Sequence, residues 1–253
     1  MRIIALTNQK GGTGKTTSAV NLGAGLSRLN KKVLLADLDP QANLTYSLGI
    51  VAHELERSVY DLFKETASTQ NLIVKKFNLD ILPSNIDLSA AEIELVGTPG
   101  REFLFKEGIK KITQVDYLLI DCPPSLGLLT INALVAAKEV FIPLQTEFLA
   151  LQGLSKLLET VEIVRKRLNS ELEVTGIIGT RYDNRKNLNR QVVDKIRESF
   201  GKKLFKTLIR ENISLAEAPS YGQTIFGYQP KSHGAEDYMD LSKEVLKMEM
   251  KDG

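Results

Sequence analysis

Residues 8–17, "NQKGGTGKTT", combine glycines, lysines and hydroxyl side chains at a spacing that could hold phosphate groups. The glycines let the backbone approach an anion closely, and N–H groups at the start of a following helix can surround phosphate oxygens. Lys15 would neutralise the β- and γ-phosphates, and the Thr16 hydroxyl would bind Mg²⁺. The candidate nucleotide-binding residues of this loop are Lys10, Gly11, Gly12, Thr13, Gly14, Lys15, Thr16 and Thr17.

The loop departs from the common phosphate-loop pattern at its start. G-x-x-x-x-G-K-[ST] requires a glycine at position 9, where this chain has Gln9, and the match is instead to K-G-G-x-G-K-[ST]-T. Lys10 begins the loop, on the side away from the phosphates that Lys15 would neutralise. Its ammonium must therefore either face solvent or reach a phosphate bound elsewhere.

Aspartates follow two apolar segments that are expected to be strands. "VLLAD" ends at Asp37, with Asp39 just beyond it, and "YLLID" ends at Asp121. Open α/β sheets bind ligands beyond the carboxyl ends of their strands. We expect Asp121 and Asp37 to hold Mg²⁺ through water, beside Thr16, whereas Asp39 begins a loop and is better placed to orient an attacking water.

Short apolar runs alternate with amphipathic segments, which is typical of βαβ units. We expect an α/β fold of the P-loop NTPase type, with a mostly parallel, twisted sheet and helices on both faces. Residues 1–253 should form a single domain, with no helix-turn-helix domain before the phosphate loop. The expected strands are 2–8, 32–39, 79–84, 117–121, 139–145, 173–180 and 203–209. The expected helices are 15–29, 126–137, 151–168, 188–199 and 234–249, with short helical pieces in 42–63 and two helices in 87–113.

The chain resembles the deviant Walker A ATPases, in which the second lysine of "KGGTGKTT" is a signature. Within them it resembles the ParA/Soj branch, which segregates plasmids and chromosomes, through "DLDPQANLT", "DCPPSLG" and "LAEAPSYGQTI". Nearly all of residues 1–247 are covered. The resemblance implies ATP and Mg²⁺ as cofactors and a homodimer in which Lys10 reaches the partner's nucleotide.

Further roles are implied only by this resemblance. Asp39 is the hydrolysis-linked residue, so the expected catalytic residues are Lys10, Lys15 and Asp39. Pro123 and Pro124 belong to a switch that senses the γ-phosphate. Asn212 is expected near the adenine, although "RENIS" departs from the family's Pro-Arg-Asn-x-Arg.

Positive charge gathers between residues 181 and 210. This segment carries ten lysines and arginines against three acidic residues, a net charge of +7 in a chain of net charge +2. It is a plausible footprint for sequence-independent contact with DNA phosphates, and the alternative is an ordinary solvated helical face. In the resembled family an arginine at the position of Arg185 contributes to DNA binding, and a second, which would fall at position 214, is Ser214 here. The candidate DNA-binding residues are Arg185, Lys186, Lys202, Lys203, Lys206 and Arg210.

Composition and the C-terminus narrow the class of protein. The single cysteine, Cys122, excludes an internal disulfide and is expected to be buried, whereas His53 and His233 are expected at the surface. Without a signal peptide or spanning segment, the chain should be cytoplasmic, and nucleoid-associated if it binds DNA. The C-terminal "LSKEVLKMEMKDG" has an apolar stripe but lacks the aromatics and the strongly basic face of a membrane-surface helix, so it should pack on the protein.

The favoured hypothesis is an ATP-dependent DNA-partitioning switch whose hydrolysis is stimulated by a ParB/Spo0J-type centromere-binding protein. Its cargo could be a chromosome or a plasmid. Two alternatives stay open. One is a MinD-like membrane-cycling ATPase of division-site placement. The other is a metabolic enzyme on the same scaffold, such as a dethiobiotin-synthetase-like ligase that phosphorylates a carboxylate.

Overall fold

A seven-stranded sheet forms the centre of the computed structural model, which describes residues 1–147 and 153–249. The strand order is β3-β4-β2-β5-β1-β6-β7, and all neighbours are parallel except β3 and β4. The expectation of a mostly parallel sheet is therefore confirmed. The strands are β1 (Arg2–Leu6), β2 (Val33–Asp37), β3 (Val74–Lys76), β4 (Leu79–Leu82), β5 (Tyr117–Asp121), β6 (Glu139–Gln145) and β7 (Glu173–Thr180).

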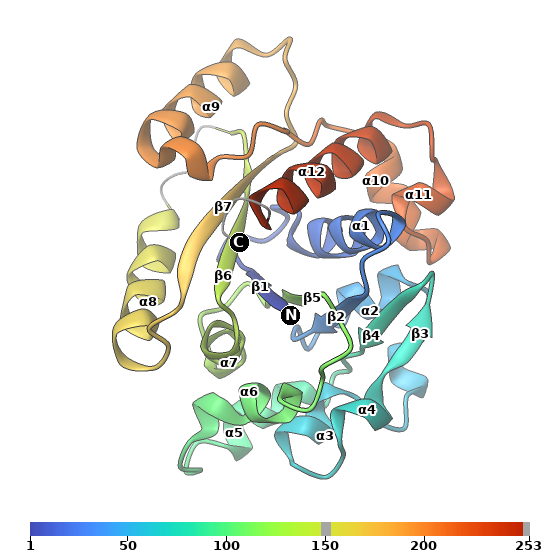
Figure 1. Ribbon diagram of the computed structural model, residues 1–253, viewed down its shortest axis with the longest axis vertical. Helices are drawn as coiled ribbons and strands as arrows, with labels where there is room; N and C mark the ends of the chain where they lie inside the picture. Colours follow the sequence, from blue (N-terminus) through green and yellow to red (C-terminus); the bar gives the residue numbers. More distant parts are fainter. Residues whose placement is uncertain (148–152, 250–253) are drawn as a thin grey trace.

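Helices cover both faces of this sheet (Figure 1). Side chains alternate across a strand, so Ile4 and Leu6 of β1 enter one apolar core and Ala5 enters the other. The first core includes α1 (Lys15–Arg28), α2 (Asn43–Ser47), α11 (Ile225–Tyr228) and α12 (His233–Glu249). The second includes α3 (Val59–Phe63), α5 (Leu88–Glu94), α6 (Leu104–Ile109), α7 (Leu128–Ala136), α8 (Leu154–Arg167) and α9 (Asn187–Phe200). Short turns are η1 (Ala52–Glu54), α4 (Thr69–Leu72), η2 (Arg101–Phe103), η3 (Gly201–Lys203), α10 (Ile213–Glu217) and η4 (Ala218–Tyr221).

The register brings the predicted site residues to one edge of the sheet. β5 lies between β1 and β2, with Leu6 paired to Asp121 and Asp37 paired to the same Asp121. Because these strands are parallel, the loop after β1 and the aspartates at the ends of β2 and β5 meet at the carboxyl edge. Cys122, next to Asp121, is fully buried as expected, and burial raises the pKa of its thiol.

The predicted strand 203–209 is wrong. After η3 the chain makes only isolated bridges, Ile177 to Leu204 and Tyr182 to Arg210. The apolar pattern that suggested a strand has another cause, because Phe205 is buried edge-on against Phe141. Strand β3, with the sequence "VKK", lacks an apolar pattern and was not predicted. Helix α8 begins at Leu154, and the start of the predicted helix 151–168 lies outside the described residues.

The C-terminal helix packs on the protein, as expected. Leu241 and Val245 of α12 are fully buried in the core that α1 shares, and the hydroxyls of Tyr238 and Ser18 lie 3.1 Å apart. Residues 250–253 lie outside the described part of the chain. In the described ranges, no helix combines the length and apolar character needed to cross a membrane.

Candidate nucleotide-binding site

The loop between β1 and α1 is shaped by glycines in left-handed conformations. Gly12 has φ 73° and Gly14 has φ 89°, a backbone conformation that residues other than glycine rarely adopt. Helix α1 begins at Lys15, directly after Gly14, and no side chain caps its first turn. The N–H groups of that turn are therefore available to an anion, where the helix dipole also favours negative charge.

Two strand ends hold this loop from outside. Gln145 Nε2, at the end of β6, donates a hydrogen bond of 2.7 Å to the Gly12 carbonyl. Thr180 Oγ1, at the end of β7, donates one of 2.8 Å to the Thr13 carbonyl. The loop is thus preorganised by residues that sequence reasoning missed. The available signal was a polar residue closing each apolar strand at the carboxyl edge.

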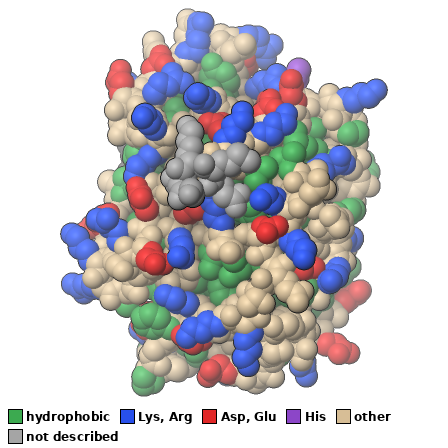
Figure 2. All heavy atoms as spheres, viewed as in Figure 1, with side chains coloured by type: hydrophobic (Ala, Val, Ile, Leu, Met, Phe, Trp, Pro, Cys, Tyr) green, Lys and Arg blue, Asp and Glu red, His purple; other side chains and the backbone are tan. Residues whose placement is uncertain are grey.

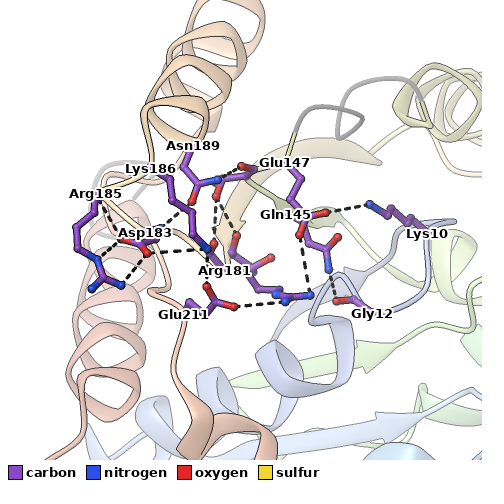
Figure 3. Close-up of polar contacts among 12 residues, drawn as sticks. Lys10, Gly12, Gln145, Glu147, Arg181, Asp183, Arg185, Lys186, Asn189 and Glu211 are labelled. Atoms are coloured by element: carbon purple, nitrogen blue, oxygen red, sulfur yellow. Dashed lines mark hydrogen bonds and ion pairs between the residues drawn. The ribbon is translucent and has the colours of Figure 1, made fainter.

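The two lysines of the loop lie in different surroundings. The Lys15 side chain reaches back across the loop, with its Nζ 3.4 Å from the Lys10 carbonyl oxygen, and the residue is 8% exposed. The Lys10 side chain is 45% exposed, and its Nζ lies 3.7 Å from Glu147 Oε2. Figure 3 shows Lys10 pointing away from the loop toward Glu147.

Thr16 and Asp121 form the part of the site with the oxygen ligands that Mg²⁺ prefers. Thr16 Oγ1 donates a hydrogen bond of 2.7 Å to Asp121 Oδ2. The other carboxylate oxygen, Oδ1, is buried and has no hydrogen-bond partner among the described residues. Burial, followed by the charge of Asp37, raises the pKa of Asp121 well above its usual range. A divalent cation would stabilise this carboxylate, so the residues present fit Mg²⁺.

Asp37 and Asp39 are more fully bonded within the protein. Asp37 Oδ1 accepts a hydrogen bond from the Asp39 N–H, and Oδ2 accepts two from Thr45, at 2.9 Å and 2.8 Å. Burial nevertheless raises the pKa of Asp37 to about 7. Asp39 is 7% exposed, and its Oδ1 accepts a hydrogen bond from the Gln41 N–H. Thr45 is a third positioning residue, after Gln145 and Thr180, that sequence reasoning missed.

Asn212 lies on the segment that follows β7 and the basic region. Its Oδ1 caps α10 by accepting a hydrogen bond of 2.8 Å from the Ser214 N–H. The preceding residue, Glu211, donates its N–H to the Tyr182 carbonyl just beyond β7. The structure therefore brings the loop, Asp37, Asp39 and Asp121 to one edge, and it places Asn212 in a helix cap beyond β7.

Five of the six predicted DNA-binding residues line three separate surface hollows. Arg185, Lys186 and Arg210 lie around the loop after β7, and each is ion-paired. Arg185 is 86% exposed and bonds Asp183, whose pKa is lowered to about 2 by those hydrogen bonds. Arg210 Nε donates a hydrogen bond of 2.9 Å to Oδ1 of Asp237, a residue of α12.

The remaining three lysines lie near the other end of α9. Lys203 pairs with Glu173 at 3.2 Å. Lys202 and Lys206 make no ion pair with any described residue, and they line a hollow of about 850 Å³ with Arg197, Lys243 and Lys247. Figure 2 shows basic and acidic side chains intermixed over this face of the molecule.

Sequence comparison connects this site with known proteins. A family model described as an AAA domain matches residues 1–174. The sporulation initiation inhibitor protein Soj of Bacillus subtilis (strain 168) is 51% identical over 247 residues, covering 96% of this chain and 98% of that protein. The chromosome-partitioning ATPase Soj of Treponema pallidum (strain Nichols) is 46% identical over 248 residues, covering 97% of each. This chain belongs to the ParA/Soj family of partitioning ATPases.

Solved structures in this wider group share the fold. A cobyrinic acid a,c-diamide synthase from Mycobacterium smegmatis, with a bound ATP analogue and magnesium, has a TM-score of 0.87 and 34% identity over 98% of this chain and 95% of that one. The septum site-determining protein MinD of Pyrococcus horikoshii OT3, complexed with Mg-ADP, has a TM-score of 0.80 and 27% identity over 98% of this chain and 96% of that one. The P-loop NTPase fold predicted from the sequence is confirmed.

Proposed function

We propose that this protein is an ATP-dependent DNA-partitioning switch that cycles between a free protomer and an ATP-bound homodimer. The observation that carries the proposal is the pair of lysines in one preorganised loop. The Lys15 side chain is buried and lies across the loop, whereas the Lys10 side chain is half exposed and extends toward Glu147. One loop can thus serve its own nucleotide with Lys15 and a second protomer's nucleotide with Lys10.

In this proposal the triphosphate of ATP lies at the start of α1. The first-turn N–H groups and Lys15 bind its β- and γ-phosphates. Thr16 and Asp121 hold Mg²⁺, which would neutralise charge on the phosphate oxygens. Asp37 would contact a magnesium-bound water, Asp39 would orient the attacking water, and Asn212 would lie near the adenine. Catalysis then rests on positioning and on charge stabilisation.

The dimer is proposed to bind DNA without sequence preference, through Arg185, Lys186, Lys202, Lys203, Lys206 and Arg210. Two protomers double the number of phosphate contacts, so dimerisation would switch DNA affinity on. A ParB/Spo0J-type partner would stimulate hydrolysis and release the dimer, which would place the protein on the nucleoid in its ATP state.

Two other functions differ from this one in what they require. A MinD-like membrane cycle needs an apolar helix face that is free to enter a membrane, but Leu241 and Val245 are buried against the protein. A metabolic ligase would turn over ATP with a small-molecule acceptor and without DNA or a protein partner. Liposome association with ATP tests the membrane cycle, and ATP turnover without DNA or a protein partner tests the ligase.

The test is DNA association of the wild type and Lys10→Ala, with ATP, with ADP and without nucleotide, over a salt series. We expect binding only with ATP, weakening as salt rises, and lost in Lys10→Ala. Liposome sedimentation with ATP is the matched control and should show no association. DNA binding that is independent of nucleotide, or unchanged in Lys10→Ala, would contradict the proposal.

A second measurement addresses hydrolysis. Asp39→Ala should accumulate the ATP-bound dimer, because the attacking water loses its orienting carboxylate while the phosphate loop is intact. Light scattering with ATP measures the mass directly. A variant that stays monomeric with ATP would remove Asp39 from the proposed role.

A further inference from the structure

Lys10 is held on its own chain by Glu147, an acidic residue that follows β6. Glu147 Oε2 lies 3.7 Å from Lys10 Nζ, and its Oε1 lies 4.0 Å from Arg181 Nη1. One carboxylate is therefore shared between two cations, one on the phosphate loop and one just beyond β7 (Figure 3). Both members of the Lys10–Glu147 pair are about half exposed, at 45% and 47%.

The position of Glu147 is determined by the strand ends that also anchor the phosphate loop. Two residues before it, Gln145 bonds the Gly12 carbonyl, and at the end of β7 Thr180 bonds the Thr13 carbonyl. Glu147 is thus carried by the same elements that shape the loop. The packed sheet edge therefore places the backbone of Glu147 near the start of the loop, within side-chain reach of Lys10.

Arg181, the second cation near Glu147, has an unusual backbone conformation. Its backbone has φ 53°, a left-handed conformation that is uncommon for residues other than glycine and often marks functional sites. Its carbonyl accepts a hydrogen bond from Thr146 Oγ1, and its guanidinium bonds Glu211 at 3.4 Å. The contacts that place Arg181 beside Glu147 do not involve Lys10.

We propose that Glu147 is a positioning residue for Lys10, which it holds on its own protomer until an ATP-bound partner is present, and that Arg181 then takes the Glu147 carboxylate alone. The inference rests on the proposed function, because it requires Lys10 to leave for a partner's nucleotide. A triphosphate offers several negative charges against one carboxylate, so the transfer is favourable. The exposed Lys10–Glu147 pair is weak enough to break readily. Each protomer must nevertheless break its own pair before the dimer forms, so the pair disfavours dimerisation.

The first test compares Glu147→Gln with Glu211→Gln. Glu211 is a matched control: its side chain is 46% exposed and pairs with Arg181 and Lys186 but not with Lys10. An exposed ion pair changes an equilibrium about twofold to fivefold, and two such pairs break in each dimer, so Glu147→Gln should tighten dimerisation by about 4-fold to 25-fold. The measurement is the dimerisation constant by analytical ultracentrifugation with a non-hydrolysable ATP analogue. Glu211→Gln should stay within about twofold of the wild type.

The outcomes separate the two proposals. If the wild type does not dimerise with the analogue, the proposed function fails. If it does dimerise but Glu147→Gln associates as the wild type does, or more weakly, the positioning role of Glu147 is overturned while the dimer stands.

The second test detects the pair directly by zero-length carbodiimide cross-linking, which joins a carboxylate and an amine in contact. Nucleotide-free protein should give a link between Lys10 and Glu147, and the analogue should reduce it in proportion to the dimer formed. The Lys186–Glu211 pair, at 2.9 Å, is the internal positive control. A missing Lys10–Glu147 link beside a clear control link, or a link that persists in the dimer, would overturn the proposal.

Discussion

The phosphate loop and the basic surface both depend on positive charge, but the protein positions that charge in opposite ways. Lys15 is 8% exposed and lies inside a loop whose carbonyls are bonded by two strand ends. Arg185 is 86% exposed and bonds a single neighbouring carboxylate. The loop is therefore a preformed site, whereas the surface is a set of ion pairs that a ligand can exchange.

This difference has an energetic consequence. An exposed ion pair contributes about 0.2–1 kcal/mol, so the basic surface can give up its partners to DNA phosphates at low cost. A buried polar group left without a partner lowers the free energy of unfolding by about 1–3 kcal/mol. A substitution in the phosphate site should therefore change both stability and ligand binding. Substitutions in the two regions should separate the effects on stability from those on ligand binding, and the five below test whether they do.

The largest effect should come from Lys15→Ala. Loss of a buried charge-assisted contact to the phosphates should weaken ATP binding by about 100-fold, measured by calorimetry. Lys10→Ala is the control on the same loop. It should keep the ATP affinity of the free protomer within about threefold, because the Lys10 side chain extends toward Glu147 and not across the loop as Lys15 does. Micromolar ATP affinity retained in Lys15→Ala would break the assignment of the loop.

Arg185→Glu should lower DNA affinity by about 20-fold in the ATP state, because the dimer loses two phosphate contacts and gains two repulsive charges. Its dimerisation should not change, since the Arg185 side chain bonds Asp183, two residues before it on the same loop. Arg165→Glu on α8, an exposed arginine paired with Glu162, is the control and should change DNA affinity less than about twofold. The readout is a salt series of binding isotherms. Equal losses in both variants would indicate a general charge effect in place of a site.

The contrast between the regions also explains what the sequence could predict. The phosphate loop is a local feature, in which residues 10–17 contain the glycines, the lysines and the hydroxyl within one turn between a strand and a helix. The aspartates were predictable because parallel strands meet at one edge. The anchors Gln145 and Thr180 could not be assigned, since the placement of β6 beside β1 and of β7 beside β6 is a property of the topology.

The basic surface was harder to predict because its partners are remote in sequence. Arg210 is a candidate DNA-binding residue in the sequence, yet its carboxylate partners, Asp237 and Glu236, lie 27 and 26 residues later on α12. The segment 203–209 failed for a related reason. Its apolar residues pack against the edge of β7 without completing a strand, so packing and not backbone pairing explains the pattern.

Arg210→Gln should therefore lower the stability of the fold and reduce DNA affinity only to a lesser extent, because Arg210 is bonded to Asp237 and Glu236. Asp237 is 5% exposed and would lose its guanidinium partner, at a cost of about 1.5 kcal/mol in the free energy of unfolding. For a chain of this size that lowers the melting temperature by about 3–6 °C, measured by thermal unfolding. The fall in DNA affinity should be smaller than in Arg185→Glu. If Arg210→Gln left the melting temperature unchanged and lowered DNA affinity as much as Arg185→Glu, Arg210 would act in DNA binding and not in stabilising the fold.

The smallest effects should differ in sign between Asp121, a buried carboxylate at the phosphate site, and Asp183, a carboxylate held in an ion pair at the basic surface. Burial raises the pKa of Asp121 in the folded protein above its unfolded value, so the nucleotide-free native state binds an extra proton between the two values. Stability contributed by this group therefore falls as pH rises from about 4 toward neutrality, and Asp121→Asn should be about 1 kcal/mol more stable than the wild type at pH 8. The difference should shrink toward pH 5, as followed by thermal unfolding without nucleotide.

Asp183 should show the opposite dependence. Its pKa is lowered to about 2 by hydrogen bonds from Arg185, so its contribution is present above pH 4 and is lost as pH falls through the folded value. Asp183→Asn should accordingly be less stable than the wild type at pH 8, with the difference disappearing near pH 2. Mg·ATP should stabilise Asp183→Asn as much as the wild type but Asp121→Asn less, because only Asp121 lies beside Thr16 at the phosphate loop. The same sign of pH dependence in both variants would mean that Asp121 is not desolvated in solution, and the contrast between a preformed buried site and an exchangeable surface would lose its electrostatic basis.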